Sequence, residues 1–408
     1  MKRKNLLPII ESLLAVLLLA AMIFGLWKLT ENKAGYQKYN GFYEDPGRYD
    51  VLFFGSSHMM NMVLPLELEK NYGIRSYNMG NGAETIPITY HVIKNTLDHA
   101  QPKIIFVEMF YAFSEKTIQG DDKEMPHQFF DTVPLSVHKK EAIYDLYSDP
   151  SDRMEFLFDF SIYHSRWNEL TAEDFRPTDD SFGGAKVLMM SYTPAETVTE
   201  EYELHEMAKV PRKYLEKIKE LCDERGIKLV CVINPYAVWN ERRVCNIDFE
   251  KEMDSLGIEF IDFRDSDAFD IYADSSDSMH LNMCGQRKMT DLYGKYLTDI
   301  GAPIHPVSDD DENWRLRYEK YVSRKARGLA SCDDCSALLT DLNDPDFKYE
   351  INVRSDAAIS DTMKRMLENA KDYPNVAITA DDTAGHNVTI RAYYIDSGTQ
   401  FLEKEFDL

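Results

Sequence analysis

The stretch Asp50–His58, which reads DVLFFGSSH, decides the fold. Its apolar run is typical of a buried strand, and Gly55 allows a sharp turn that other residues disfavour. Polar side chains directly after a strand of an α/β fold lie at the carboxyl edge of the sheet, where such folds bind ligands. Ser57 is therefore either a nucleophile or only the cap of the next helix. On this stretch alone the cap is the simpler interpretation.

Strand and helix patterns alternate from this stretch onward. We expect strands at 50–54, 74–78, 103–107, 227–233 and 258–263, and helices at 65–72, 86–99, 210–225, 249–255 and 284–298. Because the strands are apolar on both faces, the sheet should be mostly parallel and covered by helices on both sides. The pattern predicts an α/β fold, a three-layer α/β/α flavodoxin-like sandwich of about five strands. Residues 111–199 lack this regularity and are interpreted as an insertion.

The N-terminus indicates a membrane anchor. Residues 1–5 are basic, and residues 6–29 are almost wholly apolar and long enough to span a bilayer. Trp27 stands where an interfacial aromatic residue belongs. We predict a single-pass signal anchor in the cell membrane, with a cytoplasmic N-terminus and everything after Thr30 outside. The alternative is a signal peptide cleaved near Ala20-Ala21.

The remaining segments complete the predicted organisation. Residues 30–49 are interpreted as a juxtamembrane connector, 50–302 as the main domain, and 303–336 as a charged helical bridge. Residues 337–408 contain three β-like runs and one helix, at about 360–370, and are interpreted as a small independent α/β module.

The composition excludes some functions. The chain has 408 residues and a formal net charge of -24, which leaves no basic surplus to neutralise nucleic-acid phosphates. Its six cysteines are scattered, and only Cys332 and Cys335 have metal or redox spacing. No second ligand pair accompanies them, so we interpret them as an incidental pair or a local disulfide. We expect neither a metal site nor a cofactor.

A second stretch, Asp277–Asn282, changes the interpretation of Ser57. It reads DSMHLN and leads into the last helix of the main domain. A serine hydroxyl becomes a nucleophile when an imidazole accepts its proton, and a carboxylate orients that imidazole. Ser57, His280 and Asp277 supply these three groups. The alternative is that Asp277 caps the helix and His280 is a solvated residue of its first turn.

Together the two stretches resemble the SGNH hydrolase superfamily, the GDSL-like esterases. The match rests on Gly55-Ser56-Ser57 after the first strand, Asp277 to His280 before the last helix, and a looser glycine block at Asn78–Gly82. The resemblance implies that Ser57 is the nucleophile, His280 the general base and Asp277 its orienting carboxylate. It also implies an oxyanion hole made by the N–H groups of Ser57 and the Gly82 region.

The sequence departs from the family after the third strand. The family has an Asn there that supplies a third oxyanion donor, whereas this chain reads Glu108-Met109-Phe110. One missing donor costs about a hundredfold or more in rate. Either another group substitutes for it, or hydrolysis is slow.

With its anchor, the chain looks like the extracytoplasmic partners of membrane-bound O-acyltransferases. This resemblance implies a polytopic acyltransferase partner and a cell-envelope polysaccharide as substrate. Our leading hypothesis is a serine O-acyltransferase, acting on acetyl groups through an acyl-serine. The alternatives are an esterase of the same polymer with the same triad, and a non-catalytic polysaccharide-binding or docking module.

Three more residues are candidates for substrate binding. His164 and Arg166 belong to an aromatic cluster in the insertion that suits sugars or an anionic polymer, although a packed helix with a surface Arg explains the pattern equally well. His58, beside the nucleophile, faces either the site or the sheet edge.

Overall fold

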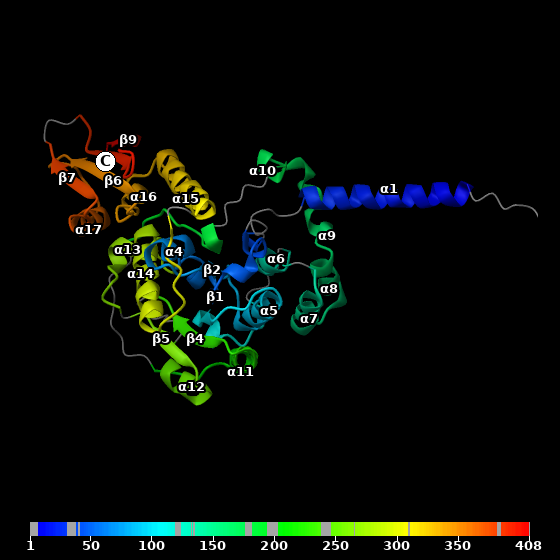
Figure 1. The fold of residues 1–408 in the computed structure, drawn as a ribbon. Helices are drawn as coiled ribbons and strands as arrows, with labels where there is room; N and C mark the ends of the chain where they lie inside the picture. Colours follow the sequence, from blue (N-terminus) through cyan, green and yellow to red (C-terminus); the bar gives the residue numbers. More distant parts are fainter. Residues whose placement is uncertain are drawn as a thin grey trace, which may run out of the picture.

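A computed structural model describes residues 7–30, 38–39, 41–118, 124–131, 133, 135–175, 182–193, 203–237, 246–264, 266–308, 311–381 and 385–407. Its main sheet has the strand order β2-β1-β3-β4-β5, and every pair in it is parallel. The strands are β1 (Val51–Phe54), β2 (Ser76–Asn78), β3 (Ile104–Glu108), β4 (Lys228–Ile233) and β5 (Glu259–Asp262). The predicted five-stranded α/β architecture is confirmed (Figure 1).

Helices cover both faces of this sheet. They are α3 (Ser57–Met60), α4 (Pro65–Tyr72), α5 (Ile86–Thr96), α11 (Lys209–Arg225), α12 (Phe249–Leu256) and α14 (Met283–Asp299). The short helix α13 (Ile271–Asp274) contacts α14 and α17 (Asp361–Ala370) instead. The sequence signals at α4 are accurate, since Pro65 opens it and Gly73 ends it in the left-handed region, at φ 67°.

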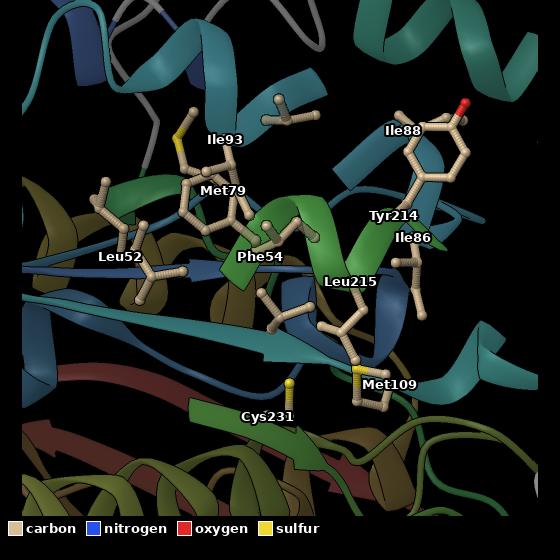
Figure 2. Packing of buried hydrophobic residues seen from close by; sticks show 14 of the residues in the cluster. Leu52, Phe54, Met79, Ile86, Ile88, Ile93, Met109, Tyr214, Leu215 and Cys231 are labelled. Carbon is tan, nitrogen blue, oxygen red and sulfur yellow. The ribbon is translucent and has the colours of Figure 1, made fainter. Parts of the chain in front are cut away.

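Alternation along the strands divides the core into two layers. Leu52 and Phe54 of β1 pack toward α5 and α11, as Figure 2 shows, whereas Val51 and Phe53 pack toward α14 on the other face. Successive strand side chains point to opposite faces, so an all-apolar strand requires cover on both. The three-layer sandwich follows from this requirement.

The insertion is built of short helices. They are η2 (Phe110–Phe113), α6 (Glu124–Phe130), α7 (Val137–Leu146), α8 (Pro150–Leu157), α9 (Phe160–Tyr163), η3 (His164–Asn168), α10 (Ala172–Phe175) and η4 (Phe182–Gly184). Several of them contact α1 (Leu7–Thr30) near its C-terminal end. Among the described residues, α1 is the helix long and apolar enough to cross a membrane.

The segment predicted as a connector is partly core, contrary to expectation. Tyr39 and Phe42 are fully buried in the main hydrophobic cluster, and the short helix η1 (Pro46–Arg48) leads directly into β1. The Lys38 ammonium also donates to the Gly80 carbonyl. The aromatic residues here pack on the domain, and their Gly- and Pro-containing surroundings concealed this in the sequence.

The C-terminal region forms a second, smaller mixed sheet of order β7-β6-β8-β9. Its elements are α15 (Glu312–Ser331), α16 (Cys335–Leu339), β6 (Phe347–Val353), α17 (Asp361–Ala370), β7 (Val376–Ala380), β8 (Val388–Tyr394) and β9 (Gln400–Phe406). Three strands and α17 agree with the sequence prediction. β9 was not predicted, because its charged residues 403–405 suit an edge strand and hide the alternation. Cys332 and Cys335 are unpaired thiols, so the predicted alternative of a local disulfide is not present.

Buried ion pairs connect this smaller unit with the main domain, which the prediction of an independent module did not anticipate. Arg287 of α14 lies 2.7 Å from Asp341 and 2.6 Å from Asp344. Lys325 of α15 lies 2.7 Å from Asp344 and 2.8 Å from Asp346. Burying such charges is tolerated only when they are paired. Through Arg287, these pairs link α14 of the main domain to the smaller unit.

Candidate active site

The turn after β1 separates the roles of two adjacent serines. Gly55 has φ +138°, and a Cβ there would lie 2.6 Å from the Glu108 Cβ, so only glycine fits. The Ser56 hydroxyl donates to Glu108 Oε2 at 2.7 Å and accepts the His58 N–H at 3.2 Å. Ser56 is therefore the buried cap of α3, and Ser57 presents its hydroxyl from the first position of that helix.

The loop before α14 is equally well fixed. Asn282 caps α14 by accepting the Gly285 N–H at 3.2 Å, and its amide donates to the Ala273 carbonyl at 2.7 Å. The Ser276 N–H donates to the His280 carbonyl at 2.9 Å, which closes the loop on itself. A Cβ on Gly285 would lie 2.7 Å from the Asp274 carbonyl oxygen. Asp277 and His280 thus stand on a rigid turn.

The structure brings the two loops together. His280 Nε2 lies 2.8 Å from Ser57 Oγ, although 223 positions separate the residues. On the other side of the ring, His280 Nδ1 lies 3.0 Å and 2.9 Å from the two Asp277 carboxylate oxygens. A hydroxyl, an imidazole and a carboxylate thus lie in a row, each within hydrogen-bonding distance of the next, which is the geometry that activation of a serine nucleophile requires.

The electrostatics favour an ionised Asp277. Partial burial raises the pKa of its carboxyl, but hydrogen bonds from His280 and the Met279 N–H outweigh this, so the pKa lies below its ordinary value. Asp277 Oδ1 accepts the N–H groups of Met279 at 2.7 Å and His280 at 2.9 Å. A carboxylate held in this way fixes the His280 tautomer with its proton on Nδ1, which leaves Nε2 free to accept a proton.

The oxyanion hole stays a prediction, and the two predicted donors, Ser57 and Gly82, differ in their hydrogen bonds. Within the described residues, no hydrogen bond occupies the Ser57 N–H, which is consistent with a donor role. The Gly82 N–H, however, donates to Asn81 Oδ1 at 3.0 Å, so Gly82 is not available as the predicted donor in this conformation. The Gly82 N–H is engaged by the side chain of the residue directly before it.

Asn81 lies beside the Ser57 turn, a position that the sequence reasoning did not single out. Its N–H donates to the Gly55 carbonyl at 2.9 Å, which holds it against the nucleophile turn. The Asn81 side-chain Oδ1 accepts the Gly82 N–H, which fixes the orientation of the side-chain amide. Its Nδ2 is the end that can donate. The sequence signal that could have pointed to Asn81 is the presence of an Asn in the glycine block after the second strand.

Glu108 ends β3 at the position where the resemblance implied an Asn, and its contacts are with the surrounding backbone and Ser56. It is fully buried, and both carboxyl oxygens are engaged, by the Ser56 hydroxyl and by the Phe110 N–H. Burial raises the pKa of Glu108 from 4.5 to about 7, with the hydrogen bonds opposing this in part.

His58 packs beside the site instead of lining an open pocket. Its ring stacks on Phe110 at 4.0 Å between centroids and lies 5.4 Å from the His280 ring. Burial lowers the pKa of His58 to about 3, so the ring is neutral. The Asn234 amide donates to its carbonyl at 2.6 Å and accepts the Tyr293 hydroxyl at 2.8 Å. Asn234, directly after β4, is a second supporting residue that the sequence reasoning missed.

The insertion candidates lie elsewhere. Arg166 Nη1 donates to the Thr30 carbonyl at 2.7 Å, and Nη2 lies 3.1 Å from Asp174. These contacts fix Arg166 against the end of α1. Substrate binding by His164 and Arg166 stays a prediction. Within the described residues, no cluster of three or more His, Cys, Asp or Glu side chains is placed to hold a metal ion.

Comparison with known proteins adds little. No known protein family matches the chain, and no curated protein is significantly similar to it. Among solved structures, the chain is similar to a "putative acylhydrolase" from Bacteroides fragilis at 12% identity, with a TM-score of 0.32 over 65% of this chain and 96% of that one. It also matches a gut microbial diltiazem-metabolizing enzyme at 14% identity, with a TM-score of 0.23 over 61% of this chain and 47% of that one. At such values neither match bears on the activity.

Proposed function

We propose that the chain is a serine enzyme that transfers acyl groups through an acyl-Ser57 intermediate. The observation that carries this proposal is the line of contacts from Ser57 Oγ to His280 Nε2, at 2.8 Å, and from His280 Nδ1 to Asp277, at 2.9 Å. A cap or a solvated first-turn histidine requires no such alignment across 223 positions. The alignment is what acyl transfer needs.

The chemistry follows from the geometry. Ser57 Oγ attacks the carbonyl carbon of an acyl ester while His280 Nε2 accepts its proton, and Asp277 stabilises the resulting imidazolium. The proposed donors to the oxyanion are the backbone N–H of Ser57 and the side-chain Nδ2 of Asn81. His280 then returns the proton to the departing alkoxide, leaving the acyl group on Ser57. A second hydroxyl, deprotonated by His280, attacks this ester and restores the enzyme.

We further propose that the acyl group is acetyl and the acceptor a hydroxyl of a cell-envelope polysaccharide. The apolar helix α1 supports this setting, because it suits a single-pass anchor with a cytoplasmic N-terminus. A polytopic membrane-bound O-acyltransferase would supply the acyl group on the outer side. His164 and Arg166 stay the proposed contacts for the polymer, whereas His58 is buried and is not proposed to contact it.

The test uses the full chain in detergent and 4-nitrophenyl acetate as the donor. An acetyl adduct should appear on the Ser57 peptide, and added polysaccharide should shorten its lifetime while becoming acetylated. Ser56→Ala is the matched control for the position of the label, which should stay on Ser57. It is not a control for the rate, because the Ser56 hydroxyl supports α3 through its bond to Glu108. If Ser57→Ala leaves acetylation and turnover unchanged, the catalytic proposal is wrong.

Ester hydrolysis is the second candidate, and one observation favours it. The Asp277 side chain is 40% exposed and that of His280 is 21% exposed, so water reaches the acyl-serine readily. An adduct that decays at the same rate with and without polysaccharide would indicate an esterase. A chain that forms no adduct at all would instead indicate a non-catalytic binding or docking module.

A further inference from the structure

Three large aromatic side chains are exposed on the part of the insertion that follows α8. Phe158 is 55% exposed, Trp167 66% and Phe175 63%. They lie at the end of α8, in η3 and at the end of α10. Exposing several large aromatic side chains in one short stretch of a soluble surface is unfavourable, and such patches mark interaction sites.

These elements surround the C-terminal end of α1. The helix contacts η3, α9 and α10, and Figure 1 shows α9 and α10 on opposite sides of its end. The Trp27 indole N–H donates to Asp159, and Arg166 donates to the Thr30 carbonyl at 2.7 Å. Thr30 is fully buried. The exposed aromatics are therefore held at a fixed height relative to the last turn of α1.

Helix geometry gives that height. α1 has 24 residues, so at 1.5 Å per residue it is about 36 Å long, slightly more than the roughly 30 Å hydrocarbon thickness of a bilayer. If the apolar residues from Pro8 onward fill the hydrocarbon, Trp27 to Thr30 lie at the lipid–water interface. The elements bonded to that turn lie at the same level, which is where Trp and other aromatic side chains are stabilised.

The charge of the segment decides between two kinds of lipid contact. Residues 149–175 contain seven Asp and Glu residues but only two Lys or Arg residues, Arg153 and Arg166. Attraction to anionic headgroups needs clustered Lys and Arg, so binding here must come from insertion of the aromatic rings. Such contact depends little on salt.

We propose that this insertion face, defined by Phe158, Trp167 and Phe175, is a second membrane-contact element that inserts its rings into the bilayer interface around α1. The inference rests on α1 crossing the membrane, which is part of the proposed function. It adds that the active-site domain is docked on the lipid surface and not free on a tether. Its occupant is lipid, not another protein.

The test places nitroxide labels at Phe158→Cys, Trp167→Cys and Phe175→Cys, one at a time, in the full chain carrying Cys245→Ser and Cys332→Ser. Ile395→Cys is the matched control, because Ile395 is an exposed apolar residue (50%) in the smaller sheet unit. In proteoliposomes, the three insertion labels should collide more often with oxygen than with a water-soluble nickel complex, at low and at high salt. The control label should show the reverse.

Two results would overturn the proposal. One is that all four labels behave like the control; the other is that in native membrane vesicles the three labels are shielded from both reagents, which would indicate a protein cover. A measurement without cysteine variants guards against misfolding: brominated phosphatidylcholine should quench the Trp167 emission, taken as the difference between wild type and Trp167→Phe. Acetylation of Ser57 is measured separately, so a failure of lipid contact is distinguishable from a failure of catalysis.

Discussion

Replacing Asp277 by Asn should impair chemistry while leaving the loop intact. Asn Oδ1 can still accept the N–H groups of Met279 and His280, which Asp277 Oδ1 now accepts. Its Nδ2 must then face His280 Nδ1, where a carboxylate oxygen now lies at 2.9 Å. An N–H donor at this position forces His280 to carry its proton on Nε2, toward Ser57. The base is thereby blocked.

The size of the effect follows from the lost charge. An imidazolium and a carboxylate 2.9 Å apart attract each other by about 1.4 kcal/mol in water and by about 6 kcal/mol at an effective dielectric constant of 20. The Asp277 side chain is 40% exposed, which favours the lower half of this range. We therefore expect a loss of about 3 kcal/mol, or roughly a hundredfold in acylation rate. A fully buried carboxylate in this role is worth about 10⁴-fold.

The assay is the second-order rate constant for acetylation of Ser57 by 4-nitrophenyl acetate, measured by mass spectrometry of the quenched chain. Asp396→Asn, in an exposed turn of the smaller sheet unit, is the control and should react like wild type. The thermal unfolding midpoint of Asp277→Asn should stay close to wild type. An Asp277→Asn chain that is acetylated at the wild-type rate would refute the role assigned to Asp277.

Three further predictions concern Asn81 and Glu108 near Ser57, and Arg287 at the contact with the smaller sheet unit. Asn81→Ala should slow acylation by about a hundredfold, since it removes one oxyanion donor; an unchanged rate would remove Asn81 from the site. Burial raises the pKa of Glu108 from 4.5 to about 7, so the folded chain retains a proton that the unfolded chain releases between these values. This contribution, at most about 3 kcal/mol, is fully present below about pH 4.5 and lost as the pH rises toward 7. Glu108→Gln resembles the protonated form, so its free energy of unfolding should fall less over this range in urea titrations; identical pH slopes would contradict the assignment. Arg287→Met leaves Asp341 and Asp344 short of a buried partner and should lower the free energy of unfolding by about 3–5 kcal/mol; a loss below about 1 kcal/mol would show that the charge network does not join the two sheets.

Much of the fold could be predicted because its signals are local. The apolar run of β1, the Pro65 and Gly73 boundaries of α4 and the alternation of strands with helices each depend on neighbouring residues. The meeting of Ser57 with His280 could be anticipated because a parallel sheet collects its strand ends at one edge.

What could not be predicted depends on partners distant in sequence. Tyr39 and Phe42 resemble connector residues until the domain packs on them. The pairing of Arg287 with Asp341 and Asp344 shows no local pattern. The hydrogen bond from the Gly82 N–H to Asn81 Oδ1 depends on the rotamer of one side chain, which no sequence motif encodes.

The most direct test of the account is labelling by a fluorophosphonate, which reacts with a serine only when a base activates it. The account predicts one adduct, on the peptide that contains Ser57, abolished in Ser57→Ala and strongly slowed in His280→Ala. A chain that takes up no label, or takes it up equally in these two variants and wild type, would contradict it.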